Sequence, residues 1–257
     1  MIQLKSQREI DVMARGGQIL ADTVTLMEKS VRPGISTEEL DKIADDFIRS
    51  HPGAIPSFKG LYNFPASICT SINNEIVHGI PSRRRVLIEG DIVSVDVGVK
   101  FEGYHTDSAT TVPVGDIPAE SKRLLETTRA ALDAGVNAAR NGNHLGDIGA
   151  AVQAVVERAG FSVVRDLVGH GIGSGFHEEP QVPNYGKPSR GLRLVPGLTI
   201  AIEPMVNVGK AGIRTMPDRW TVVTVDGTRS AHFEHTVAIT ENGPRVLTKS
   251  ALVHATS

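Results

Sequence analysis

The sequence lacks four features that would assign it to other classes of protein. It contains one cysteine, Cys69, so an internal disulfide and any site built from several cysteines are excluded, and a reducing compartment is indicated. No stretch approaches the roughly 18 consecutive apolar residues of a membrane span. Charged residues such as Lys5 and Arg8 interrupt the region where a signal peptide needs an apolar core. With 27 Lys and Arg against 29 Asp and Glu, the chain has no excess positive charge for tight nucleic-acid binding. We therefore expect a cytoplasmic protein with no membrane contact and no direct sequence-specific contact with nucleic acid.

The composition is otherwise that of an ordinary globular protein, with 40% hydrophobic and 22% charged residues. A length of 257 residues fits one large domain or two fused halves. We expect a single domain over residues 1–257, with internal halves at approximately 1–115 and 116–257.

Helix signals occur in pairs along the chain. Serine followed three residues later by glutamate, the capping-box spacing, occurs at Ser6 and Ser36, and each helix should end before the Pro-Gly that follows it. Pro118 suits the first turn of a third helix, and a fourth should end at Gly160. Short strands are predicted around residues 67–72, 91–97, 103–112, 198–203, 220–225 and 233–240.

The two halves also resemble each other in detail. Residues 90–96 (GDIVSVD) and 197–203 (GLTIAIE) each place a carboxylate six residues after a glycine, and a His-Gly-Ile triplet occurs at both His78 and His170. An internal duplication would place equivalent carboxylates around a pseudo-two-fold axis. The carboxylates at equivalent positions are Asp96 with Glu203, and Asp107 with Glu234.

The alternation of side chains along the strands predicts that these carboxylates share a site. In residues 91–97 the valines share one face and Asp96 lies on the other, so each strand has an apolar face for helices and a polar face with small neighbours. Four buried carboxylates repel one another, and two bridged divalent cations would resolve the repulsion. The alternative is that each carboxylate ends a strand and bonds to backbone or to an arginine. A donor set rich in oxygen, with some nitrogen and no sulfur, suits Mn, Fe, Co or Zn.

Residues 169–177 (GHGIGSGFH) have glycine at every second position, which argues against a helix and for backbone held close to a ligand. Ser174 replaces the third glycine of a dinucleotide-binding motif, and Gln181 replaces the second histidine of H-E-x-x-H. His170 and His177 are therefore candidate ligands or proton carriers. We interpret His51, His144, His232 and His254 as surface or turn residues, and His105 and His235 as packing or hydrogen-bonding residues.

Together, these motifs resemble those of type I methionine aminopeptidases over essentially the whole chain. The motifs that carry the resemblance are Asp96 and Asp107 eleven residues apart, residues 169–173 (GHGIG), 176–182 (FHEEPQV), 202–205 (IEPM) and 233–236 (FEHT).

The resemblance implies the α+β "pita-bread" fold, in which two related halves form an antiparallel sheet covered by helices. It also implies removal of N-terminal methionine from nascent proteins and peptides when the second residue is small, by hydrolysis at a dinuclear centre. Asp107 and Glu234 would bridge two divalent ions (Co, Mn, Fe or Zn). The full ligand set implied is Asp96, Asp107, His170, Glu203 and Glu234.

The resemblance further implies that His78 and His177 contact the scissile peptide group, and we expect Glu203 to shuttle protons. The methionine pocket implied by the family consists of Leu61, Phe64, Cys69, Phe176 and Trp220, although core packing is the alternative for each. Cys69 is expected to be a small apolar wall, not a nucleophile. Family analogy suggests a monomer that contacts the ribosome.

Two alternative functions are considered, one with a different substrate and one without catalysis. An Xaa-Pro peptidase would use the same fold and metals with another pocket, and a non-catalytic binding protein would keep the fold alone. The intact set of ligand positions argues against the second alternative.

Overall fold

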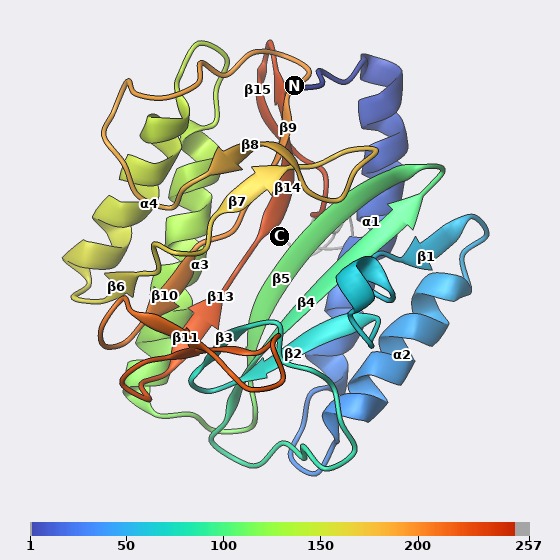
Figure 1. Cartoon of the computed structure of the whole chain (residues 1–257), viewed down its shortest axis with the longest axis vertical. Helices are drawn as coiled ribbons and strands as arrows, with labels where there is room; N and C mark the ends of the chain where they lie inside the picture. The colour runs from blue at the N-terminus through green and yellow to red at the C-terminus, as the bar shows by residue number, and fades with distance from the viewer. Residues whose placement is uncertain (1, 250–257) are drawn as a thin grey trace, which may run out of the picture.

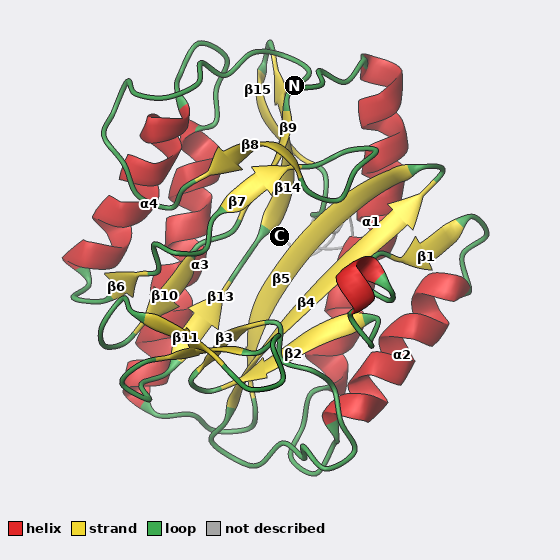
Figure 2. Cartoon of the chain, viewed as in Figure 1, coloured by secondary structure: helices red, strands yellow, loops and turns green. Residues whose placement is uncertain are grey.

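The computed structural model describes residues 2–249, which contain four α-helices and fifteen β-strands. Two helices precede the first long strands, and a second helix pair precedes the later strands (Figures 1 and 2). The helices are α1 (Gln7–Ser30), α2 (Thr37–Arg49), α3 (Ala119–Ala138) and α4 (Leu145–Arg158), with a short 3₁₀ helix η1 (Leu61–Asn63). The strands are β1 (Ala54–Pro56), β2 (Ile68–Ile72), β3 (Glu75–Val77), β4 (Ile92–Phe101), β5 (Tyr104–Pro113), β6 (Ser162–Val163), β7 (Gly169–Gly171), β8 (Glu178–Val182), β9 (Thr199–Ile202), β10 (Met205–Asn207), β11 (Ile213–Thr215), β12 (Val222–Thr224), β13 (Ser230–His232), β14 (His235–Thr240) and β15 (Gly243–Val246).

Antiparallel pairing joins these strands into four sheets. The first sheet has the order β1-β4-β2 with β5 paired to β4, and another has the order β15-β14-β9-β7-β8. Two smaller sheets, β13-β10-β6 and β11-β12-β3, complete the arrangement. The predicted α+β fold with antiparallel sheets and a repeated order of elements is therefore confirmed. Gly90 and Gly197, which begin the two related segments, even share a φ of 91°.

Both predicted capping boxes are present at the starts of α1 and α2. The backbone N–H of Ser6 donates to Glu9 Oε2 at 2.7 Å, and the hydroxyl of Ser6 accepts from the backbone N–H of Glu9. Glu9 accepts a further bond from the Tyr104 hydroxyl at 2.7 Å, which ties α1 to the start of β5. Helix α3 begins at Ala119, one residue after the position predicted from Pro118.

The apolar faces of the strands pack against the helices as predicted. Val93, Val95 and Val97 of β4 are fully buried against residues of α1 and α2 such as Leu20 and Leu40. In the other half, residues of β9 pack in the same way against α3 and α4. Figure 1 shows α1 and α3 behind the strands, so the polar faces of the two halves turn toward the viewer.

A line of side-chain hydroxyls joins the two halves where β5 passes residues 232–236. The Thr236 hydroxyl accepts from the Asp107 N–H and donates to the Asp107 carbonyl, both at 2.8 Å. The Ser108 hydroxyl donates to the Glu234 carbonyl at 2.7 Å. The N–H of Glu234 donates to the carbonyl of Ala109. Asp107 and Glu234 are thus fixed side by side by bonds to their own backbone.

The strand predicted over residues 233–240 begins two residues later, at His235. Phe233 and Glu234 leave the ladder because their N–H groups bond to Pro204 and to Ala109 of β5. The strand predicted over 220–225 shortens similarly to Val222–Thr224, since Trp220 and Thr221 bond to the carboxylate of Asp218. Among residues 2–249, every helix is too short or too polar to cross a membrane.

The capping box of α1 gives the first prediction. Replacing Glu9 with alanine should lower the free energy of unfolding by about 1 kcal/mol, the usual cost of a lost cap. Bonds from Ser6 and Tyr104 lower the pKa of Glu9 to about 2. This contribution should therefore be complete above the unfolded pKa of about 4.3 and be lost as pH falls toward 2.

Urea unfolding at several pH values would measure the free energy of unfolding that Glu9→Ala loses. Glu39→Ala is the matched control, because Glu39 completes the same box on α2 through Ser36. Equal losses for the two variants would contradict the added role of Tyr104.

Candidate metal centre

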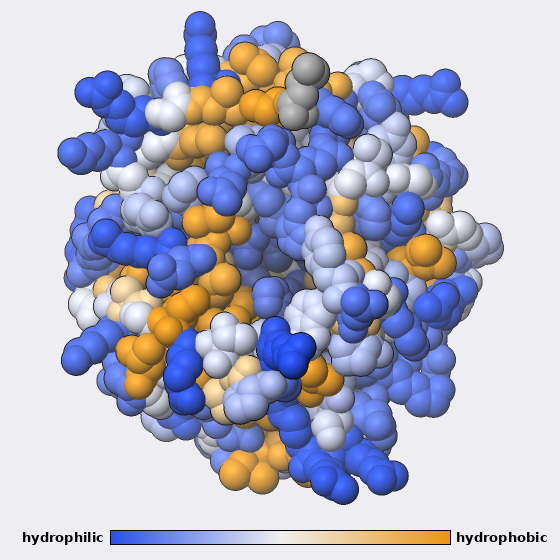
Figure 3. Space-filling model, viewed as in Figure 1, coloured by the Kyte–Doolittle hydropathy of each residue, from blue (hydrophilic) through white to orange (hydrophobic). Residues whose placement is uncertain are grey.

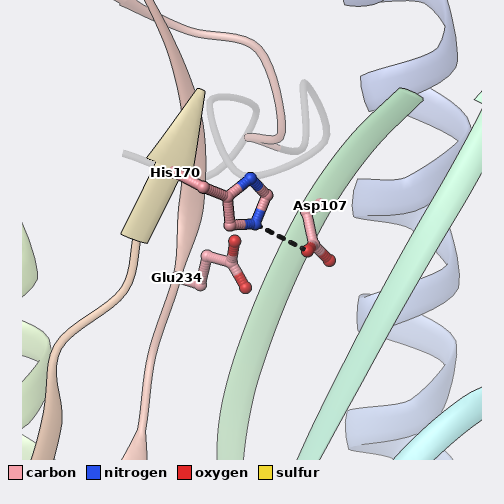
Figure 4. Close-up of side chains that lie close together, drawn as sticks. All are labelled: Asp107, His170 and Glu234. Atoms are coloured by element: carbon pink, nitrogen blue, oxygen red, sulfur yellow. Dashed lines mark ion pairs between the residues drawn. The ribbon is translucent and has the colours of Figure 1, made fainter. Parts of the chain in front are cut away.

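The four predicted carboxylates come together where the two halves meet. Asp96 lies on β4 and Asp107 on β5, and because Asp96 pairs with Ala109 the two carboxylates share one face of the hairpin. Glu203 directly follows β9, and Glu234 lies between β13 and β14. His170 of β7 faces them, and Figure 4 shows Asp107, His170 and Glu234 converging from separate elements.

The distances in this cluster fit a cation between its donors. His170 Nε2 lies 3.8 Å from Asp107 Oδ2 and 3.7 Å from Glu203 Oε1, too far for a good hydrogen bond. One ligand atom each from Asp107, His170 and Glu234 lie within 4.8 Å of one another. A second such group, Glu203, His232 and Glu234, shares Glu234 with the first.

Burial makes the cluster costly without a cation. Asp107 and Glu234 are 5% and 1% exposed, and burial together with the neighbouring carboxylates raises the pKa of each well above its usual range. Burial and the nearby Glu203 raise the pKa of Asp96 to about 6. Within residues 2–249, one oxygen each of Asp96, Asp107 and Glu234 has no hydrogen-bond partner. These orphaned oxygens and the oxygen-rich donor set fit divalent cations.

The hydrogen bond that Nδ1 makes sets the tautomer of His170. His170 Nδ1 lies 2.8 Å from the carbonyl of Gly171, so Nδ1 carries the proton and donates it there. The lone pair of Nε2 then faces the carboxylates, which is the state that binds a metal.

The interpretation of His232 as a surface or turn residue is wrong. Its side chain is 2% exposed, and its Nε2 lies 3.6 Å from Glu203 Oε2 and 3.9 Å from Glu234 Oε2. A signal for this position existed, because side chains two residues apart in an extended segment share a face, and His232 is two residues before Glu234. The other histidines fit their interpretation better: His51 and His144 lie at helix ends, and His105 bonds to Ser57. His254 lies outside the described residues.

A cavity of about 550 Å³ opens in front of the cluster. Figure 3 shows this face hollowed near its middle, with hydrophobic surface beside the hollow. The structure brings together in this cavity every residue predicted for the site: Leu61, Phe64, Cys69, His78, Asp96, Asp107, His170, Phe176, His177, Glu203, Trp220 and Glu234. Sequence reasoning missed other lining residues, among them His232, Val77 and Met205.

Aromatic rings form one wall of the cavity. The rings of Phe64 and Trp220 meet edge to face at 5.0 Å, and those of Phe58 and Phe176 at 5.3 Å. Gly98 permits this packing, because a Cβ there would lie 2.8 Å from the Phe58 ring and 3.0 Å from that of Phe176. The thiol of Cys69 is buried beside them. Burial and the nearby carboxylates raise its pKa, so it stays protonated.

Two further histidines lie at the cavity and are not among the cluster's donor groups. The ring of His78 lies 6.4 Å from that of Trp220, and burial lowers its pKa. The ring of His177 stacks on Tyr62 at 5.7 Å, and its Nδ1 lies 3.3 Å from the Tyr62 hydroxyl. Reduced hydration and the adjacent His170 lower the pKa of His177 to about 4. Both rings are therefore neutral near pH 7.

The glycine-rich loop before His177 is held by a buried ion pair. Glu178 pairs with Lys5, whose side chain is 4% exposed, and Glu178 Oε1 accepts from the Gly175 N–H at 2.9 Å. On the other side of the loop, the N–H of His105 donates to the Gly173 carbonyl at 2.7 Å. The position of His177 thus depends on the start of the chain.

Comparison with known proteins gives consistent matches. The model of "Metallopeptidase family M24" matches residues 11–241. A methionine aminopeptidase from Clostridium perfringens is 53% identical over 248 residues, which cover 96% of this chain and 99% of the relative. Methionine aminopeptidase 1 of Bacillus subtilis is also 53% identical, over 97% of this chain and all of the relative. The crystal structure of a Thermotoga maritima methionine aminopeptidase superposes with a TM-score of 0.95 at 42% identity, covering 97% of this chain and 100% of that one.

The ion pair under the loop gives the second prediction. Lys5→Met should leave Glu178 as a buried charge without its partner, so that Glu178 turns to water and releases Gly175. Amide hydrogen exchange at Gly175 should accelerate about tenfold or more. Arg15→Met is the control, because Arg15 pairs with Glu102 at the exposed surface. An exchange rate unchanged by Lys5→Met would contradict the role of the pair.

Proposed function

The chain belongs to metallopeptidase family M24, and from that premise we propose that it removes the N-terminal methionine from nascent proteins and peptides when the second residue is small. The observation that carries the proposal is the position of the carboxylate–imidazole cluster. It lies in the same cavity as a wall of aromatic and apolar side chains. A metal-binding cluster beside an apolar pocket suits a hydrolase that binds the first side chain of a peptide and cleaves the bond after it.

We propose that two divalent cations occupy the cluster, with Asp107 and Glu234 shared between them. Orphaned oxygens on both of these residues support this assignment. When bound, such ions activate water as a nucleophile near neutral pH. The donor set admits Co, Mn, Fe or Zn. The proposed ligands are Asp96, Asp107, His170, Glu203 and Glu234.

The protein's own residues would then orient the peptide and move its proton. The neutral ring of His177 can donate one hydrogen bond to the scissile carbonyl oxygen as negative charge develops there. His78, which lines the same cavity beside Trp220, would contact the leaving amide. Glu203 is less buried than Asp107 and Glu234, at 14% side-chain exposure, and is our choice as proton shuttle.

The apolar wall would select methionine. Leu61, Phe64, Cys69, Phe176 and Trp220 surround the cavity beside the cluster, and an unbranched thioether packs well against aromatic edges. A free amine can bind a divalent ion held by the cluster, whereas an acetylated one cannot. These two features together support an exopeptidase.

Partners and location follow from the same function. The substrates are the N-termini of peptides and nascent proteins, so contact with the ribosome in the cytoplasm fits the proposal, and we propose that the chain acts as a monomer with one domain. The buried free thiol of Cys69 agrees with a reducing compartment.

A metal-replacement assay tests the function and gives the third prediction. Protein stripped with chelator should regain activity with Mn, Fe, Co or Zn and release methionine from Met-Gly peptides with a free amine. Met-Ile, Leu-Gly and acetylated peptides should be poor substrates. Cleavage of Xaa-Pro peptides instead would overturn the pocket assignment. No cleavage with any metal, despite bound ions, would favour a non-catalytic binding protein.

Single substitutions separate the proposed roles and give the fourth prediction. His177→Ala should lower kcat by about 10²-fold, as loss of an oxyanion partner does, while bound metal is retained. Asp107→Ala and Glu234→Ala should abolish turnover in a folded chain, because each removes a shared ligand. Glu241→Ala is the control, since Glu241 is exposed and bonds to Asn141. Loss of metal from His177→Ala, or full turnover by Glu234→Ala at saturating metal, would count against these roles.

A further inference from the structure

His232 is a buried histidine that neither the predicted ligand set nor the proposed mechanism uses. Its side chain is 2% exposed, and neither Nδ1 nor Nε2 has a hydrogen-bond partner among residues 2–249. Leaving a polar ring without partners in a protein interior is costly. The ring is therefore placed for a partner that is neither side chain nor backbone.

The backbone holds His232 rigidly in place. His232 pairs with Met205 in the β10–β13 ladder, and its N–H donates to the hydroxyl of Thr111 at 2.9 Å. The same hydroxyl donates to the His232 carbonyl at 2.9 Å. Thr111 in turn bonds to Ser94 of β4. Residues of both halves thus fix the backbone of His232.

The geometry of His232 repeats that of His170 on the other side of Glu203. His170 Nε2 lies 3.7 and 3.8 Å from two carboxylates, and His232 Nε2 lies 3.6 and 3.9 Å from two. Glu203 belongs to both sets, with Oε1 toward His170 and Oε2 toward His232. Donors bound at about 2.1 Å to one ion at the tetrahedral angle lie about 3.4 Å apart. A small inward movement of the donor atoms around His170, or of those around His232, would bring them to that spacing.

We propose that His232 is a second imidazole ligand of the metal centre, binding through Nε2 the ion that Glu203 and Glu234 also hold. The inference rests on the metal centre proposed above and adds a ligand to it. Imidazole favours Co and Zn over Mn, so the ion beside His232 should show that preference more strongly than carboxylates alone would give.

Co²⁺ added to the chelator-stripped full chain counts imidazole ligands directly. A histidine bound through Nε2 to paramagnetic Co²⁺ has a strongly shifted, exchangeable Nδ1–H proton signal. Both Nδ1 atoms are shielded, since that of His170 bonds to Gly171 and that of His232 is buried. With two equivalents of Co²⁺, the wild-type protein should show two such signals.

Three variants assign the signals. His232→Gln should remove one signal and weaken the binding of one Co²⁺ equivalent about tenfold or more, while His170→Gln should remove the other signal. His235→Gln is the matched control and should keep both, because His235 bonds to Thr248 instead.

One signal in the wild type, or two that persist in His232→Gln, would overturn the inference and leave the proposed centre intact. Absence of any Co²⁺ binding would overturn both. The wild-type count decides even if His232→Gln folds poorly.

Discussion

The burial of acidic side chains at the junction of two half-sheets is the constraint on which the structure depends. Threonine and serine hydroxyls tie β5 to residues 232–236 through the backbone of Asp107 and Glu234, so these side chains cannot separate to relieve their repulsion. Desolvation and mutual repulsion raise their pKa values. A divalent cation removes this cost, and a family of metallopeptidases is what the comparisons show.

The same junction determines the shape of the cavity. Small residues such as Gly98 bring the aromatic rings of Phe58 and Phe176 close to the β4–β5 hairpin. The loop that carries His177 is fixed from below by Lys5 and Glu178, and from the side by the backbone of His105. A rigid acidic floor and a wall of apolar rings therefore line one cavity.

Local rules predict much of this protein. Capping boxes at Ser6 and Ser36 and the valine alternation in β4 need only neighbouring residues, and the structure has both. The carboxylate set could be predicted because residues 90–96 and 197–203 resemble each other and place Asp96 and Glu203 at matching positions. His232 was missed because the strand predicted over residues 233–240 began one residue after it, so the face that it shares with Glu234 was not considered. Lys5 pairs with a residue 173 positions away, a contact that sequence spacing cannot reveal.

The most direct test of this account is the melting temperature of chelator-stripped protein as Mn²⁺ is added. A cation that holds together carboxylates from both halves binds the folded chain alone, so Tm should rise with the logarithm of Mn²⁺ concentration. At a hundredfold excess over Kd the stabilisation of about 2.7 kcal/mol corresponds to a rise of about 5–10 °C. Glu234→Ala should abolish that rise. A wild-type Tm that does not change with Mn²⁺ would contradict the claim that the buried acidic cluster is a metal centre.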